Sequence, residues 1–208
     1  MKHEAMLSRC MRNNCVKCPN LVKTRSRIVS GYGDPTAGIL IVGLAPGRNG
    51  ADKTGVPFTG DPSGMLLQEA LISSGISKEA KPNVVKPRLS AYITNIVKCN
   101  PQDSMGRNRP PTEKELINCT EYLVEEMNLI RPKIIVALGT IVWKHLQGRE
   151  MERTMDNLIR KNGTHIVKAY HPGYAIRGGN GALSRSMYPS YFSRIIHTQE
   201  MSLVLGED

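Results

Sequence analysis

The feature that most constrains the fold of this chain is a set of short, continuous apolar runs that recur along it. Runs of this kind, rich in Ile and Val and followed by Gly, Pro or Asn, are typical of strands buried on both faces of a sheet. There are four, at residues 38–43 (GILIVG), 91–97 (AYITNIV), 133–138 (KIIVAL) and 164–170 (THIVKAY). Helical patterns separate them, at residues 63–73, 112–130 and 140–147, the second beginning with a capping-box pattern of Thr112 and Glu115. This alternation predicts an α/β fold, a three-layer α/β/α sandwich around a central four-stranded, mostly parallel sheet.

The length of 208 residues suits one domain. We therefore expect a single domain over residues 1–208, with an N-terminal cysteine-bearing segment at about residues 10–30 and a helical tail at about residues 181–208. In parallel sheets of this kind, ligands bind in the loops that follow the carboxyl ends of the strands. The unusual residues of this chain fall in those loops, so the site is expected there.

The charge of the chain is strongly positive. Lys and Arg number 28 against 18 Asp and Glu, which gives a formal net charge of +10 and a pI near 9.5. This balance favours a polyanionic partner, nucleic acid first and an acidic membrane surface second, although solubility alone would also explain it. We find no signal-peptide pattern and no run of eighteen apolar residues, and therefore expect a cytoplasmic protein, or a nuclear one in a eukaryote, that works without a membrane. We also expect a monomer.

Cysteine spacing predicts a metal site. A reducing compartment disfavours disulfides, so clustered cysteines indicate a metal or reactive thiols. Cys15 and Cys18 form a C-x-x-C pair, Cys99 follows the second predicted strand, and Cys119 falls within the long predicted helix. Four thiolates suit a tetrahedral zinc or an iron–sulfur cluster, and the spacing does not separate the two. Cys10 is left over, either free or in competition with Cys15 for one ligand position.

An ordered set of motifs now narrows the function. It comprises residues 43–47 (GLAPG), 55–61 (GVPFTGD) with 63–64 (SG), 92–99 (YITNIVKC), 108–110 (NRP), Cys119, 132–139 and 170–174 (YHPGY). In this order the motifs resemble the uracil-DNA glycosylase superfamily over about residues 15–180. The cysteine pattern and the ITNIVKC and HPGYAIR segments look like the fourth family, whose first motif normally carries a glutamate where Leu44 stands. The long first loop and the missing glutamate look more like the fifth family.

The resemblance implies excision of uracil from DNA, and the fifth-family features would extend the range to other deaminated bases. It also implies a 4Fe-4S cluster on Cys15, Cys18, Cys99 and Cys119. Phe58 matches the aromatic that stacks on the base, and Asn95 matches the amide that pairs with the uracil edge. His171 matches the histidine that donates toward O2 as the departing base becomes negative. Loop backbone donors complete the base-binding set, which is Leu44, Ala45, Pro46, Gly47, Phe58, Asn95 and His171.

The group that acts on the attacking water is less constrained. No lysine falls on a motif position that would suggest a Schiff base, so water is the expected nucleophile. Asp61 is the leading candidate because it lies in the FTGD turn beside Phe58 and matches a fifth-family acid. Asp52 and Asn108 are the alternatives. Asp61 would also suit the N-terminus of the helix that follows it, as a capping residue.

Phosphate contacts are expected from basic residues around the inferred mouth, namely Arg48, Lys53, Arg107, Arg109 and Arg177. Residues 174–177 (YAIR) are the candidate loop that fills the space of the flipped base. Two other readings stay open at this stage. One is a metal-stabilised nucleic-acid-binding module with weak catalysis, which the missing glutamate at Leu44 favours. The other, a zinc hydrolase, is disfavoured because the five histidines show no i, i+4 pair.

Overall fold

The computed structural model describes residues 14–147, 152–155, 158–161 and 163–198. Its centre is the parallel sheet that the apolar runs predict. Strands β3 (Tyr92–Asn95), β2 (Ile39–Gly43), β4 (Ile134–Leu138) and β7 (Thr164–Ala169) lie side by side in that order, and each neighbouring pair is parallel. The four predicted strands and their direction are therefore confirmed.

The sheet is wider than the four strands predicted. Strand β1 (Tyr32–Gly33) pairs antiparallel with β3, and β6 (Leu158–Lys161) pairs antiparallel with β7. Strand β5 (Glu152–Met155) adds a further antiparallel pair, so that the sheet has seven strands in the order β1-β3-β2-β4-β7-β6-β5. These edge strands are two to four residues long and mix polar with apolar residues, so they lack the long apolar run that marks a buried strand.

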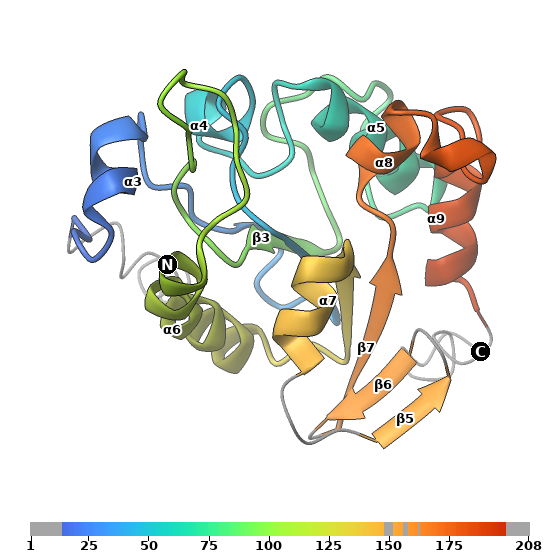
Figure 1. Cartoon of the computed structure of the whole chain (residues 1–208). Helices are drawn as coiled ribbons and strands as arrows, with labels where there is room; N and C mark the ends of the chain where they lie inside the picture. Colours follow the sequence, from blue (N-terminus) through green and yellow to red (C-terminus); the bar gives the residue numbers. More distant parts are fainter. Residues whose placement is uncertain (1–13, 148–151, 156–157, 162, 199–208) are drawn as a thin grey trace.

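Helices cover both faces of the sheet, as the sandwich prediction requires (Figure 1), and the buried residues form two apolar cores. Alternate strand residues point to opposite faces, and Ile39 and Ile41 of β2 join one core while Leu40 and Val42 join the other. Helices α5 (Pro62–Ser73), α8 (Pro172–Ile176) and α9 (Tyr188–Ile196) supply residues to the first core. Helices α3 (Pro19–Thr24), α6 (Glu113–Ile130) and α7 (Thr140–Gln147) supply residues to the second.

The helix boundaries follow local sequence signals. The predicted capping box of α6 is present, because Thr112 Oγ1 accepts from the N–H of Glu115 and the Glu115 carboxylate accepts from the N–H of Thr112. Two short helical elements, α4 (Ala51–Thr54) and η1 (Gly179–Gly181), lie in loops. The predicted tail contains α9, while residues 199–208 fall outside the described part of the chain. No described helix is both long and apolar enough to cross a membrane.

Candidate active site

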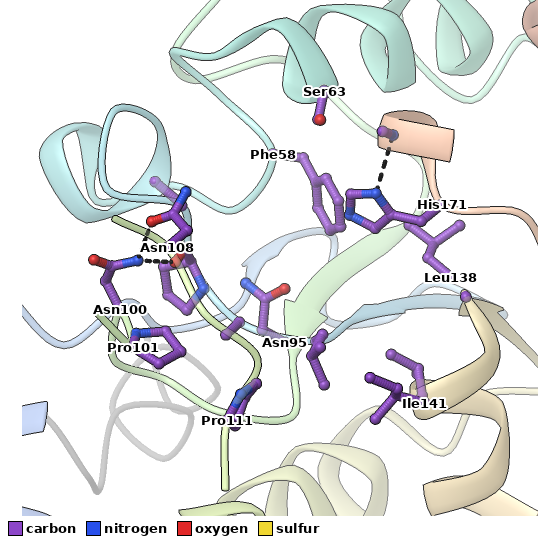
Figure 2. Close-up of a pocket in the computed structure, with 18 of the residues that line it drawn as sticks. Phe58, Ser63, Asn95, Asn100, Pro101, Asn108, Pro111, Leu138, Ile141 and His171 are labelled. Atoms are coloured by element: carbon purple, nitrogen blue, oxygen red, sulfur yellow. Dashed lines mark hydrogen bonds between the residues drawn. The ribbon is translucent and has the colours of Figure 1, made fainter. Parts of the chain in front are cut away.

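A cavity of about 450 Å³ opens at the carboxyl ends of the four parallel strands. Each of these strands is followed by a segment that contributes to its wall, which is the placement expected for a parallel sheet. The cavity brings together most of the predicted site residues, namely Leu44, Ala45, Pro46, Gly47, Phe58, Asp61, Asn95, Asn108, Arg109, His171 and Arg177. Figure 2 shows Phe58 and His171 on one side, Asn100 and Asn108 on the other, and Asn95 between them.

Phe58 and Asn95 both approach β2 closely at Gly43. A Cβ atom on Gly43 would lie 2.4 Å from Asn95 Oδ1 and 2.5 Å from Phe58 Cζ, so a side chain there would displace both. Phe58 also adopts a left-handed backbone conformation, with φ of +54°. Bulky residues rarely adopt this conformation, and where they do it often marks a functional site. The glycine therefore lets the ring and the amide meet at one end of the cavity.

His171 is held as a neutral hydrogen-bond donor. It caps the N-terminus of α8, where its Nδ1 accepts from the N–H of Gly173 at 3.0 Å (Figure 2). Burial, and secondarily the positive charge of Arg177, lowers the pKa of His171 from 6.5 to about 4. A neutral imidazole that accepts at Nδ1 carries its proton on Nε2. Since His171 lines the cavity, the ring can donate this proton in a hydrogen bond to a bound base.

A buried ion pair holds the main chain at Asn95, and the sequence motifs do not reveal this pair. The Lys98 ammonium donates to the main-chain oxygen of Asn95 at 2.7 Å and to Thr94 Oγ1 at 2.6 Å. It also pairs with Glu126 of α6 at 2.7 Å, and the two charged side chains are 1% and 3% exposed. All three ammonium donors thus have a partner, as a buried charge requires. The pair connects the end of β3 to α6.

Asp61 combines the two roles that the sequence suggests for it. Its Oδ1 caps α5 by accepting from the N–H of Gly64 at 2.7 Å. Its Oδ2 faces the glycines of the first loop, since Cβ atoms on Gly47 and Gly50 would lie 2.8 Å and 2.3 Å from it. One carboxylate oxygen therefore stabilises the helix while the other is turned toward the loop that lines the cavity.

Asn108 stands at the mouth of the cavity in a fixed orientation. Its Oδ1 accepts from the main-chain N–H of Arg48 at 3.0 Å and from Asn100 Nδ2 at 2.9 Å. Asn100 is fully buried and donates a second bond to the Pro46 carbonyl at 2.7 Å. With its oxygen occupied in this way, Asn108 presents Nδ2 as a donor near Gly47. Sequence reasoning missed Asn100, which follows Cys99 and reads as an ordinary loop residue.

Asp52 does not join this group. Its side chain is 1% exposed and lies outside the cavity lining. Both carboxylate oxygens accept from the N–H of Ser26 at 3.1 Å, so that Asp52 anchors the segment that precedes the sheet. The structure therefore gives this candidate a structural position instead of one beside the substrate.

Comparison with known proteins agrees with this geometry. The family model of the uracil DNA glycosylase superfamily matches residues 30–196. This chain belongs to that superfamily. A type-5 uracil-DNA glycosylase of Pyrobaculum aerophilum is 34% identical over 182 residues, covering 76% of this chain and 78% of the relative. A type-4 enzyme of Thermotoga maritima is 35% identical over 178 residues, with 82% of each chain covered. A type-5 enzyme of Thermus thermophilus is 32% identical over 200 residues, with 84% and 89% covered.

The superfamily resemblance drawn from the motifs is thus confirmed, and relatives of both types match at comparable identity, which fits a sequence with features of each. The predicted DNA-contacting residues of this superfamily member divide into two groups. Arg48, Lys53 and Arg177 are exposed, and Arg177 also lines the cavity. The other two form ion pairs within the chain: Arg107 pairs through Nε with Asp103 while its side chain stays 69% exposed, and Arg109 forms a bidentate pair with the Glu115 carboxylate at 2.8 and 2.7 Å. Arg109 therefore braces the loop before α6, and its guanidinium is not free for a phosphate.

The four cysteines of the predicted metal site gather around the second core. Cys99 and Cys119 are buried in it, and Cys15 and Cys18 pack against it. Three of the sulfurs accept hydrogen bonds: Cys99 from Arg25 at 3.2 Å, Cys119 from the N–H of Lys98 at 3.3 Å, and Cys18 from Asn118 at 3.4 Å. Within the described residues, no three potential ligands come close enough to form a metal site as they stand. Cys10 lies outside the described part of the chain.

Proposed function

We propose that this protein is a monofunctional uracil-DNA glycosylase, which hydrolyses the bond between uracil and deoxyribose in DNA. The observation that carries the proposal is the cavity in which Phe58, Asn95 and a neutral His171 converge. A glycosylase needs a stacking surface, a partner for the base edge and a donor for the departing base, and the cavity wall offers one of each. Its size suits a single flipped base rather than a duplex, because clefts for small ligands begin at about 300 Å³.

In the proposed mechanism, the flipped uracil enters the cavity and stacks on Phe58 while the Asn95 amide pairs with its O4 and N3–H. Negative charge then develops on the base as the glycosidic bond breaks. His171 Nε2–H is oriented by the bond at Nδ1 and donates to O2, where this charge accumulates. A low histidine pKa keeps the ring a neutral donor throughout, so the base leaves as an anion held by a hydrogen bond.

Water is the proposed nucleophile, since the described residues that line the cavity include no lysine. We assign activation of this water to Asp61, whose Oδ2 faces Gly47. Asn108 Nδ2 lies close to the same glycine. A carboxylate there can accept a proton from the water and stabilise positive charge on the sugar. Asn108 is oriented as a donor, which suits it to hold the water or a phosphate rather than to act as a base.

We further propose that Cys15, Cys18, Cys99 and Cys119 hold a 4Fe-4S cluster, with zinc as the alternative. The donor set supports it: four thiols from three separate segments surround one core, and N–H groups already reach three of the sulfurs. Such bonds stabilise thiolates, the form that binds metal. When bound, the cluster would supply structural cross-linking of the N-terminal segment to β3 and α6. A monomer acting on DNA in the cytoplasm, or in a nucleus, completes the proposal.

The test is release of uracil from an end-labelled duplex that contains one uracil, followed by alkaline cleavage at the abasic site. The wild type is compared with His171→Ala, Asp61→Ala and Asn108→Ala, and DNA binding is measured in parallel. We expect His171→Ala to slow base release far more than it weakens binding. A wild type that binds DNA but releases neither uracil nor hypoxanthine would instead support a metal-stabilised DNA-binding module.

A further inference from the structure

The chain between β3 and α6 forms a hairpin over residues 101–111, called here the 101–111 hairpin. Gln102 and Asn108 make an isolated antiparallel bridge. Beyond it, the N–H of Asp103 donates to the Arg107 carbonyl at 2.9 Å, and the N–H of Gly106 donates to the Asp103 carbonyl at 3.0 Å. Asp at the first and Gly at the fourth position are favoured in such a turn, and Gly106 has a φ of +72° that suits glycine.

Side chains brace this hairpin from within and from outside. Asp103 Oδ1 accepts from the N–H groups of Met105 and Arg107 at 2.9 and 2.8 Å. The Arg48 guanidinium donates to the Gly106 carbonyl, and the Gln102 side chain donates to the Thr24 carbonyl at 2.9 Å. The hairpin is thus tied at its tip to the loop after β2 and, through its first arm, to the end of α3. A hairpin held in this way presents its tip in one fixed position.

The tip residue is apolar. Met105 is 72% exposed, more than any other large apolar side chain in the described ranges. Single exposed apolar residues are ordinary on protein surfaces and need no explanation alone. Met105 differs in its surroundings, because Arg107 follows it closely in the turn and Arg48 contacts the peptide beside it. An apolar tip with cationic neighbours matches a nucleic-acid surface, where phosphates flank stacked bases.

The hairpin also stands at the edge of the cavity. Pro101, Asn108, Arg109 and Pro111 of its two arms line the cavity wall. In Figure 1 the segment that leads into α6 rises beside α4, and α8 lies on the opposite side of the same rim. The arms of the hairpin therefore form part of the wall of the cavity that a flipped base would enter.

A base that leaves the duplex leaves a gap in the stack, and enzymes and architectural proteins fill such gaps with apolar side chains, methionine included. The sequence-based candidate for this role, residues 174–177, lies at the end of α8 and is less exposed than Met105 in its apolar members. Tyr174 stacks on Tyr170 with ring centroids 4.7 Å apart, Ala175 is buried, and Ile176 is 37% exposed against 72% for Met105.

We infer that Met105 is a wedge that enters the base stack of DNA beside the flipped nucleotide, with Arg48 and Arg107 on the adjoining phosphates. The inference rests on the proposed glycosylase function and adds to it a substrate preference. A wedge helps only where a stack must be opened and held open. Met105 should therefore matter for double-stranded DNA and be irrelevant for single strands.

The test compares Met105→Ala with wild type in single-turnover release of uracil from a duplex and from the same strand unpaired. We expect release from the duplex to slow about tenfold, since opening a base step costs a few kcal/mol, and release from the single strand to stay within about twofold. Met105→Leu should restore the duplex rate. Ile117→Ala is the matched control, because Ile117 is 65% exposed on α6 outside the cavity lining, and it should change neither rate.

A second measurement does not depend on catalysis. The proteins are bound to a duplex that carries an abasic-site analogue next to 2-aminopurine, whose fluorescence rises when it unstacks. We expect wild type to raise the fluorescence more than Met105→Ala does. Equal fluorescence for the two proteins would overturn the wedge, as would equal loss of rate on both substrates, or a duplex-specific loss in Ile176→Ala but not in Met105→Ala. Failure of wild type to release any uracil would refute the glycosylase proposal while this binding measurement still decides the wedge.

Discussion

The low pKa of His171 makes the stability of the protein depend on pH in a defined window. In the folded protein burial holds this pKa at about 4, against 6.5 for an ordinary histidine. Below pH 6.5 the unfolded chain therefore takes up a proton that the folded chain refuses, and stability falls as the pH drops from about 6.5 to about 4. Thermodynamic linkage then lowers the free energy of unfolding by about 2 kcal/mol at pH 5 and by about 3 kcal/mol at pH 4. These are upper values, because the His171 side chain is not wholly buried and solvent screens part of the effect.

The assay is urea unfolding of wild type and His171→Gln at about pH 7.5, 6, 5 and 4. Glutamine keeps an acceptor for the Gly173 N–H but has no group that titrates in this range. The difference in unfolding free energy between the two proteins should shift by about 3 kcal/mol in favour of the variant from the highest to the lowest pH. A pH-independent difference, or a His171 titration near pH 6.5 by NMR, would refute the neutral donor. Protonation of His171 should correspondingly cause no fall in the rate of uracil release between neutral pH and about pH 5.

Three further outcomes are expected. Asp61→Asn should keep the α5 cap and its stability while base release falls, whereas Asp61→Ala should also lose about 0.5–2 kcal/mol of stability; equal rates for Asp61→Asn and wild type would remove the carboxylate from the mechanism. Lys98→Met should destabilise the protein by about 3–5 kcal/mol in thermal or urea unfolding because Glu126 is left buried without its partner, and adding Glu126→Leu should recover most of that loss. Cys119→Ala should lower the amount of iron bound per protein, measured by colorimetric assay and by the visible spectrum. An unchanged iron content would refute Cys119 as a ligand of the proposed cluster.

The sequence predicted the centre of the fold, and the residues it proposed for base binding lie together in the cavity for the same physical reason. Both depend on local signals that survive without a structure. Strands buried on two faces must be continuously apolar, and residues at strand ends such as Asn95 and His171 are placed in space once the strands are placed. Phe58 was found through its Pro-Phe-Thr-Gly turn, whose backbone conformation is as unusual as its sequence.

What the sequence could not predict depends on contacts between distant segments. Lys98 reads as an ordinary charge after an apolar run, and only the position of Glu126, 28 residues later, shows why it is buried. Asn100 likewise gains its role through Pro46, 54 residues earlier. Arg109 was expected at a phosphate because its charge is visible in the sequence, while its bidentate pairing with Glu115 depends on how the loop meets α6.

The position of Leu44 bears on the proposed mechanism, in which the first motif supplies no carboxylate. Leu44 lines the cavity but also packs against the second core, so a charge at this position would be partly withdrawn from water. The polar groups of the site stand instead around Gly47, three residues later, where Asp61 reaches in from the start of α5 and Asn108 from the 101–111 hairpin. Both are held by main-chain partners, Asp61 by Gly64 and Asn108 by Arg48. Because the two come from separate elements that meet at Gly47, the proposed water site depends on more than a single motif, which supports testing Asp61 and Asn108 together as well as singly.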